Sequence, residues 1–228
     1  MGLRTRFAAG FARQLGHPSG PAGRLVARML NKGNSRAVHG AVDAADPRPG
    51  QSVADFGFGG GVGFRPRLDR AGPTGHVHGV EIAETMLDGA RRRFAAEVGG
   101  GRLHLHSGDL TALPLADASL DAAITTNTIY FIEDLPRAFA EVARVVRPGG
   151  RFVVGIGDPE EMRKYPFTAH GFRLRPVDEV VELLQAAGFA EPERRRVGES
   201  AGAFHLLVAE RAERAEHAEH AERDGPDR

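Results

Sequence analysis

The feature that most constrains the fold is an alternation of strand-like and helix-like segments between residues 52 and 210. Short apolar runs typical of strands lie at 52–56, 76–81, 102–106, 120–126, 151–157 and 203–210. Between several of them, apolar residues recur at helical spacing, around 86–98, 135–146 and 177–184. Strands that alternate with helices usually pair in parallel within a sheet covered on both faces. The pattern therefore predicts a layered α/β fold.

The flanking segments differ in composition. No acidic residue precedes Asp43, and Leu3, Phe7, Phe11 and Leu15 lie four apart, which predicts an N-terminal helix. The alternative is an arginine-rich transit peptide. Further helices are expected at 23–30 and 35–45. The low-complexity tail has no apolar stripe larger than alanine, which predicts a solvated helix or disorder. We therefore expect a helical cover at 1–49, a central domain at 50–208 and a charged tail at 209–228.

Composition excludes several kinds of site. The chain has no cysteine, which excludes disulfides, thiolate metal ligands and cysteine nucleophiles. Its formal net charge of zero gives no argument for nucleic-acid binding. No apolar run approaches the ~20 residues that span a bilayer, and the start lacks the apolar core of a signal peptide. We therefore expect a cytoplasmic protein without a membrane span.

Histidines recur at alternate positions of two predicted strands, at His76, His78, His104 and His106. Alternate residues of a strand point to the same face, so these rings share one surface. No carboxylate or cysteine completes a ligand set, and solvated histidines on a strand edge are the simpler interpretation. We predict no metal site there, and none at HAEHAE in the tail.

A glycine-rich turn, within VADFGFGGGVG at 53–63, follows the first predicted strand. In open parallel sheets, ligands bind beyond the carboxyl ends of the strands, so this turn is placed for a nucleotide-like ligand. The dinucleotide fingerprint G-x-G-x-x-G fails, because Val62 and Phe64 stand where its third glycine belongs. The pattern that fits is Asp-x-Gly-x-Gly-x-Gly, formed by Asp55, Gly57, Gly59 and Gly61.

Polar residues follow the next three predicted strands. Glu81 closes the second strand, and a carboxylate offers two acceptors to the two hydroxyls of a ribose. Asp109 follows the third strand, where it is placed to accept from an exocyclic amine, and Asn127 ends the fourth. Each residue alone is more often a turn or a solvated residue. Their conjunction with the glycine turn indicates a binding site.

The chain resembles the class I S-adenosylmethionine-dependent methyltransferases, most of all the group with the ubiquinone and menaquinone C-methyltransferases and many small-molecule methyltransferases. The stretches that carry the resemblance are VADFGFGGG, GVEIAETMLDGARRRF and SGDLTALPLADASLDAAITTNTIYFIEDLPRAFAEVARVVRPGGRF. It is close over 50–157 and looser over 170–208. It implies a doubly wound, seven-stranded, Rossmann-like sheet, mostly parallel with an antiparallel last strand, and S-adenosylmethionine as the cofactor.

The resemblance also implies roles for single residues. The glycine loop would lie beneath the methionine moiety, Glu81 would bind the ribose, and Asp109 would lie near the adenine amine. Phe58 departs from the small residue usual between the first two glycines, and its bulk would narrow the mouth of the site. The implied cofactor-binding residues are Asp55, Gly57, Gly59, Gly61, Glu81, Ile82, Met86, Asp109, Leu110 and Asn127.

Methyl transfer requires mainly that nucleophile and methyl group are aligned in a dry site, and a general base only for a weakly acidic nucleophile. Tyr130, three residues after Asn127, is a candidate substrate contact, or equally a core aromatic. His170 is a candidate base. The arginine-rich residues 1–42 fit an acidic or phosphorylated substrate, although solvated arginines on helix backs explain the charge as well.

We expect methyl transfer to a small molecule. Nucleic acid is disfavoured because TTNTIYF, at 125–131, lacks the Pro-Pro-aromatic step of such enzymes. A homodimer is the candidate assembly. Two alternatives stay open: a cofactor-binding scaffold or regulator without catalysis, and an NAD-dependent oxidoreductase, which Val62 and Phe64 oppose.

Overall fold

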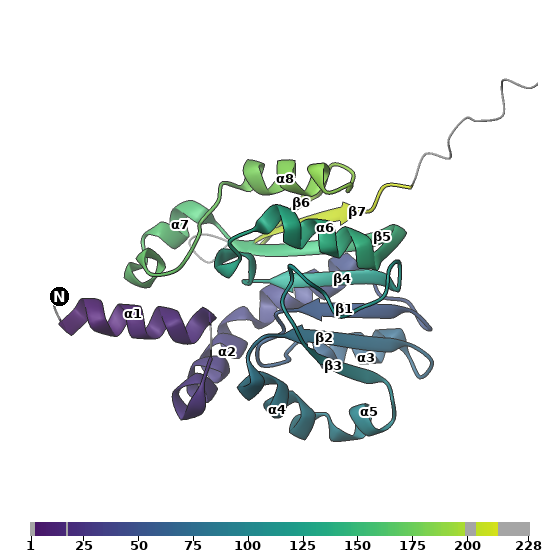
Figure 1. The fold of residues 1–228 in the computed structure, drawn as a ribbon, viewed down its shortest axis with the longest axis horizontal. Coiled ribbons are helices and arrows are strands. Elements are labelled where there is room, and N and C mark those ends of the chain that lie inside the picture. The colour runs from purple at the N-terminus through teal and green to yellow at the C-terminus, as the bar shows by residue number, and fades with distance from the viewer. Residues whose placement is uncertain (1–2, 17, 199–203, 214–228) are drawn as a thin grey trace, which may run out of the picture.

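A seven-stranded sheet forms the centre of the molecule in the computed structural model, which describes residues 3–16, 18–198 and 204–213 (Figure 1). The strand order is β3-β2-β1-β4-β5-β7-β6. Neighbouring strands pair in parallel except β7, which is antiparallel to both β5 and β6. The strands are β1 Ser52–Phe56, β2 His76–Glu81, β3 Leu103–Ser107, β4 Leu120–Thr126, β5 Val146–Gly157, β6 Glu193–Val197 and β7 Phe204–Glu210. The predicted fold class is confirmed.

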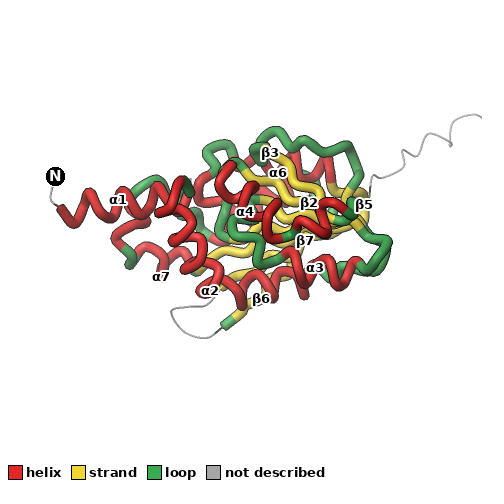
Figure 2. Tube along the Cα trace, turned by 90° about the horizontal axis from the view of Figure 1, so that it is seen from below, coloured by secondary structure: helices red, strands yellow, loops and turns green. Residues whose placement is uncertain are grey.

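Helices cover both faces of the sheet, and α1 projects from one end of the molecule (Figure 2). The α-helices are α1 Leu3–Gly16, α2 Gly20–Ala45, α3 Phe64–Ala71, α4 Glu84–Arg93, α5 Ala95–Gly99, α6 Leu135–Val145, α7 Pro159–Arg163 and α8 Val177–Ala186. Two short 3₁₀ helices, η1 Ile129–Phe131 and η2 Pro166–Ala169, follow β4 and α7. None of the described helices has the length and apolar character to cross a membrane.

Two apolar clusters fill the space between sheet and helices. On one face, Phe56 and Val154 pack with Phe139 of α6 and Leu184 of α8. On the other face, residues of α2, α3 and α4 pack against alternate strand positions such as Val53. Both faces are therefore buried at the centre of the sheet, as its continuously apolar strands require.

The N-terminal segment differs from the prediction of separate helices at 23–30 and 35–45. One helix, α2, runs without interruption from Gly20 to Ala45 and packs against β4 and β5. Gly33 and Asn34 did not end it, because each costs a helix interior only about 1 kcal/mol, which packing against the sheet offsets. The predicted N-terminal helix is α1. Of the tail, Ala209 and Glu210 end β7, and residues 214–228 lie outside the described part of the chain.

The helix predicted around 86–98 is broken in two. Phe94 leaves the helical conformation, with φ −116° and ψ 34°, and separates α4 from α5. Its ring is buried and packs edge-on against Phe64 of α3, with ring centroids 5.5 Å apart. Burial of a large aromatic ring stabilises the fold by more than the loss of one helical turn costs, so the break at Phe94 is favourable.

Histidines line one face of β2 and β3, as their alternation predicted. His76 Nδ1 lies 3.2 Å from His104 Nε2, and His78 Nδ1 lies 3.2 Å from His106 Nε2. The other ring nitrogen of His78 lies 3.1 Å from Ser52 Oγ. In the described residues, no group of three or more His, Asp or Glu side chains is arranged to hold a metal ion.

Candidate functional site

A cavity of about 490 Å³ lies at the carboxyl ends of β1, β2 and β4. The glycine loop 57–63 forms one wall, and the turn after β3 and the segment 126–134 form two others. The end of α1 and the middle of α2 complete it through Leu15, Asn34 and Val38. Segments far apart in the sequence therefore meet where open parallel sheets bind ligands.

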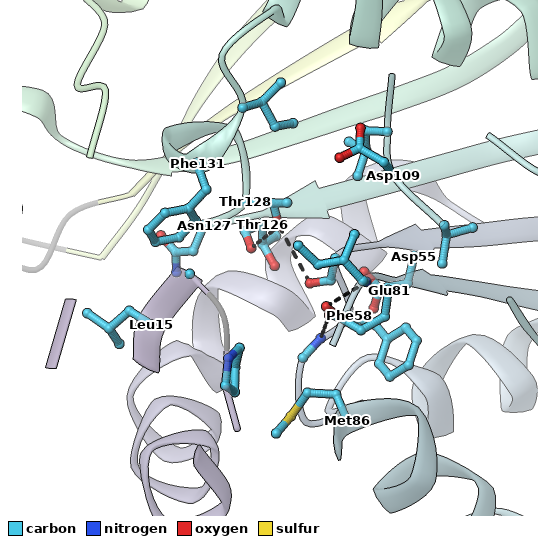
Figure 3. A pocket seen from close by; sticks show the side chains of 18 of the residues that line it. Leu15, Asp55, Phe58, Glu81, Met86, Asp109, Thr126, Asn127, Thr128 and Phe131 are labelled. Atoms are coloured by element: carbon cyan, nitrogen blue, oxygen red, sulfur yellow. Dashed lines mark hydrogen bonds between the residues drawn. The ribbon is translucent and has the colours of Figure 1, made fainter. Parts of the chain in front are cut away.

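Glu81 joins the end of β2 to the glycine loop. Its carboxylate is buried, and Figure 3 shows it pointing towards the glycine loop. It accepts three backbone N–H groups, from Gly59 at 2.9 Å, Ile82 at 2.9 Å and Ala83 at 3.0 Å. Burial raises the pKa of this carboxyl, and the three N–H donors oppose that shift. Two carboxylate oxygens offer about four acceptor positions, so one remains for a further donor in the cavity.

The positions Gly57, Gly59 and Gly61 of the loop favour glycine for different physical reasons. Gly57 has φ 69°, and a Cβ there would meet Thr128 Oγ1 at 2.4 Å, so glycine lets the loop approach the end of β4. Gly59 has φ 51°, and a Cβ there would have no atom within 4 Å. It lines the cavity, so its missing side chain leaves room for a ligand. Gly61 has φ 71°, lies against Phe64, and does not line the cavity.

Asp55 lines the cavity but also forms a buried ion pair. Its Oδ2 accepts from Arg67 Nη1 at 2.9 Å, and the two side chains are 5 % and 1 % exposed. Burial raises the pKa of Asp55, and the neighbouring guanidinium opposes the shift. Gly63 is tied to this pair, because a Cβ on it would meet Arg67 Nη1 at 2.1 Å. Arg67 belongs to α3, a helix that the sequence pattern did not predict.

Phe58, the departure from the family pattern, is accommodated inside the protein. Its ring is 7 % exposed and packs on Phe64, with centroids 4.8 Å apart. Gly79 in β2 provides the space, because a Cβ there would lie 2.9 Å from Phe58 Cδ1 and 2.5 Å from Phe64 Cζ. Phe58 contributes to the cavity lining, but most of its bulk fills the core beneath it.

The other predicted residues line the same cavity from two sides. Ile82 and Met86 follow β2, and Ile82 is 39 % exposed although it is a large apolar side chain. Asp109 and Leu110 follow β3, and Asp109 Oδ1 accepts from the backbone N–H of Thr111 at 2.7 Å. An apolar surface beside a free carboxylate oxygen suits a nucleobase with an exocyclic amine.

Asn127 follows β4 directly and has an unusual backbone conformation. Its φ of 57° lies in the left-handed region, which asparagine tolerates better than most residues. Its side chain lines the cavity, beside Thr128, whose hydroxyl lies near the carbonyl oxygens of Phe56 and Gly57 at 3.4 and 3.5 Å. Thr128 was not predicted, and its position one residue after Asn127 was the available signal.

The two candidate catalytic residues are not in the cavity lining. Tyr130 is 3 % exposed, and its hydroxyl accepts from the backbone N–H of Gly157 at 2.6 Å. Burial raises the pKa of this phenol. These contacts favour the core interpretation of Tyr130, and contradict the expectation that it lines the pocket. His170 follows η2 and is half-buried. Its role as a base stays a prediction.

The sheet order and this site define a class of protein: an α/β domain that holds a nucleoside-containing ligand against a glycine loop and an acidic residue at the end of the second strand. Residues 54–154 match the family model described as "Methyltransferase domain". The chain therefore contains an S-adenosylmethionine-dependent methyltransferase domain, as the resemblance implied.

Relatives support this assignment. The chain is 39% identical over 168 residues to an uncharacterized 37.1 kDa protein in transposon TN4556 of Streptomyces fradiae, covering 66% of this chain and 47% of that protein. It is 37% identical over 139 residues to the ubiquinone/menaquinone biosynthesis C-methyltransferase UbiE of Paracoccus denitrificans, covering 60% of this chain and 55% of the relative. The chain thus spans about half the length of these curated relatives.

A solved structure confirms the fold. The SAM-dependent methyltransferase from Aquifex aeolicus superposes with a TM-score of 0.66 at 19% identity, over 82% of this chain and 97% of that one. S-adenosylmethionine is the cofactor of the family, and the cavity fits it on three observations: the open space at Gly59, the free acceptor position of Glu81 and the exposed Ile82.

Proposed function

We propose that the chain transfers a methyl group from S-adenosylmethionine to a small-molecule acceptor by in-line displacement. The observation that carries the proposal is that one cavity holds the glycine loop, Glu81, Asp109 and Asn127 together with an apolar wall from α1 and η1. The cofactor supplies a methyl group already activated by its sulfonium. The protein then has to align the two reactants and keep water out.

The residues divide this work. Glu81 and Ile82 hold the nucleoside part, and Asp55 and Asn127 lie at the end of the cavity where the methionine part belongs. We also propose that residues 1–49 form the helical cover of a domain that spans 50–208, with 209–228 as a charged tail. In support, Leu15 and Val38 of the cover line the cavity.

The proposal also covers the location of the protein, its substrate class and its assembly. We propose a cytoplasmic bacterial protein, since both curated relatives described above are bacterial. Nucleic acid is disfavoured as a substrate, because five carboxylates line the cavity and would repel phosphates: Asp55, Glu81, Asp109, Glu133 and Asp134. A homodimer stays a prediction.

Calorimetry with S-adenosylhomocysteine and with NADH tests the cofactor assignment. We expect saturable binding of S-adenosylhomocysteine and none of NADH. Binding of NADH alone would support the oxidoreductase alternative and contradict the proposal. Turnover of labelled S-adenosylmethionine with a panel of phenols, amines and acids then separates an enzyme from a scaffold that binds the cofactor without transfer.

Replacing Glu81 by Ala should weaken binding of S-adenosylhomocysteine by ~1–3 kcal/mol, because the ribose loses its acceptor and the Gly59 N–H is left without a partner. Titration calorimetry measures the change. Glu84→Ala is the matched control, since Glu84 begins α4, is exposed and pairs with Arg91 at the surface. An affinity of Glu81→Ala equal to that of the control would remove Glu81 as the ribose ligand.

A further inference from the structure

The cavity has two chemically different ends. Figure 3 shows Glu81, Phe58 and Met86 on one side, and Leu15 and Phe131 on the other. The first side holds the residues assigned to the cofactor. The second side is where an acceptor has to enter to meet the methyl group.

The acceptor side is walled by apolar groups from three segments. They are Leu15 near the end of α1, Pro18 before α2, Val38 of α2, Phe131 of η1 and Ile132 directly after it. Phe131 is held from both sides, because its ring lies 4.7 Å from the ring of Phe172 and directly against Gly16. A Cβ on Gly16 would lie 2.8 Å from the Phe131 ring, so this wall is closely packed.

The charges in the cavity have one sign among the described side chains. Two lining carboxylates are paired with arginines outside the lining, Asp55 with Arg67 and Glu133 with Arg173, each at 2.9 Å. The lining also contains Glu81, Asp109 and Asp134, and no described lysine, arginine or histidine. At short range in a partly buried site, like charges repel each other more strongly than they do in water. This field attracts a sulfonium cation and repels an anionic acceptor.

The N-terminal arginines whose side chains the structure describes do not offset the negative field of the cavity. Arg13 of α1 and Arg36 of α2 are exposed, and neither lines the cavity. For these two arginines, the solvated interpretation fits better than a contact with an acidic or phosphorylated substrate. Asn34 and Asn127 are uncharged polar groups of the lining, able to orient a hydroxyl or an amine.

We propose, on the basis of the proposed function, that the acceptor is an uncharged molecule with a flat apolar body, seated between Leu15 and Phe131, and that acidic and phosphorylated molecules are rejected. Phe131 is then a specificity-determining residue, because its ring supplies the largest apolar surface on the acceptor side. The methylated atom is an oxygen, nitrogen or carbon nucleophile carried by that body. The methyl group leaves the sulfonium, which becomes S-adenosylhomocysteine, and the proton that the acceptor loses passes to water.

A pair of matched probes tests this assignment in protein saturated with S-adenosylhomocysteine. 2-Naphthol and 2-naphthoate share one ring system and differ in charge at neutral pH. We expect calorimetry or fluorescence to give about tenfold tighter binding of 2-naphthol, because a carboxylate has to approach the carboxylates of the lining. Equal or tighter binding of 2-naphthoate, or no binding of 2-naphthol, overturns the proposal.

Two variants test whether 2-naphthol binds beside Phe131. Phe131→Ala should weaken 2-naphthol binding by about five- to tenfold through lost apolar contact. Tyr165→Ala is the control, since Tyr165 is a 46 % exposed aromatic outside the cavity. Equal effects of the two variants contradict the assignment. Failure of S-adenosylhomocysteine to bind would instead contradict the proposed function, so the two failures are distinguishable.

Discussion

Replacing Arg67 by Met should lower the free energy of unfolding by about 3–5 kcal/mol, because it leaves the Asp55 carboxylate buried without its cation. The pair is almost inaccessible, with side chains 1 % and 5 % exposed. Urea unfolding at pH 7 measures the change. Asp55 in this variant has to take up a proton on folding, so its pKa stays above the unfolded value. The loss of stability should therefore shrink as the pH falls.

Two further variants make the result decisive. Arg70→Met changes the same helix at an exposed ion pair with Asp43, and should cost less than about 1 kcal/mol. Asp55→Asn combined with Arg67→Met removes both charges and should recover part of the loss. A loss from Arg67→Met no larger than that from Arg70→Met would show that the buried pair does not stabilise the fold.

Acid should destabilise the protein through His78. Burial, and then the neighbouring His104, His106 and His76, lowers the pKa of His78 to about 4. Its contribution to stability is fully present above the unfolded pKa of about 6.5 and is lost as the pH falls from there towards 4. A shift of this size corresponds to about 3 kcal/mol at most. Burial, and then the neighbouring His104, also lowers the pKa of His106, which adds to the effect.

Urea unfolding between pH 7.5 and 4.5 measures this dependence. His78→Gln should flatten the curve below pH 6.5, because glutamine takes up no proton. His39→Gln is the control, since His39 is exposed and belongs to α2, not to the histidine face of β2 and β3. Parallel curves for His78→Gln and the wild type would exclude His78 as the source of the acid sensitivity.

The centre of the fold was predictable because its signals are local and strong. Short apolar or alternating runs marked six of the seven strands, and the glycine turn marked the end of β1. β6 gave no such signal, since ERRRV carries three arginines and its first four residues are exposed. β6 lies at the edge of the sheet, where charged side chains can stay in solvent, and its pairing with β7 holds it there. The seventh strand was therefore expected from the family resemblance alone.

Elements fixed by tertiary contacts were not predictable. FRPRLDRA forms α3 around the buried Arg67, and nothing in the sequence distinguishes this arginine from its solvated neighbours. The break at Phe94 likewise depends on Phe64, which lies thirty positions earlier.

For the site, nine of the ten predicted cofactor residues line the cavity and Gly61 does not. Leu15 and Phe131 also line the cavity, because α1 packs against the segment after β4. No local sequence pattern predicts this contact.

The hydrogen bonds of Glu81 have a consequence for the thermodynamics of binding. Its carboxylate accepts hydrogen bonds from the backbone of Gly59, Ile82 and Ala83, which holds the glycine loop against the end of β2. The conformational entropy of the glycine loop is therefore lost during folding, and little of it is left to lose when a nucleoside enters. Preorganisation of this kind predicts that a nucleoside ligand associates fast, and that its binding costs little loop entropy.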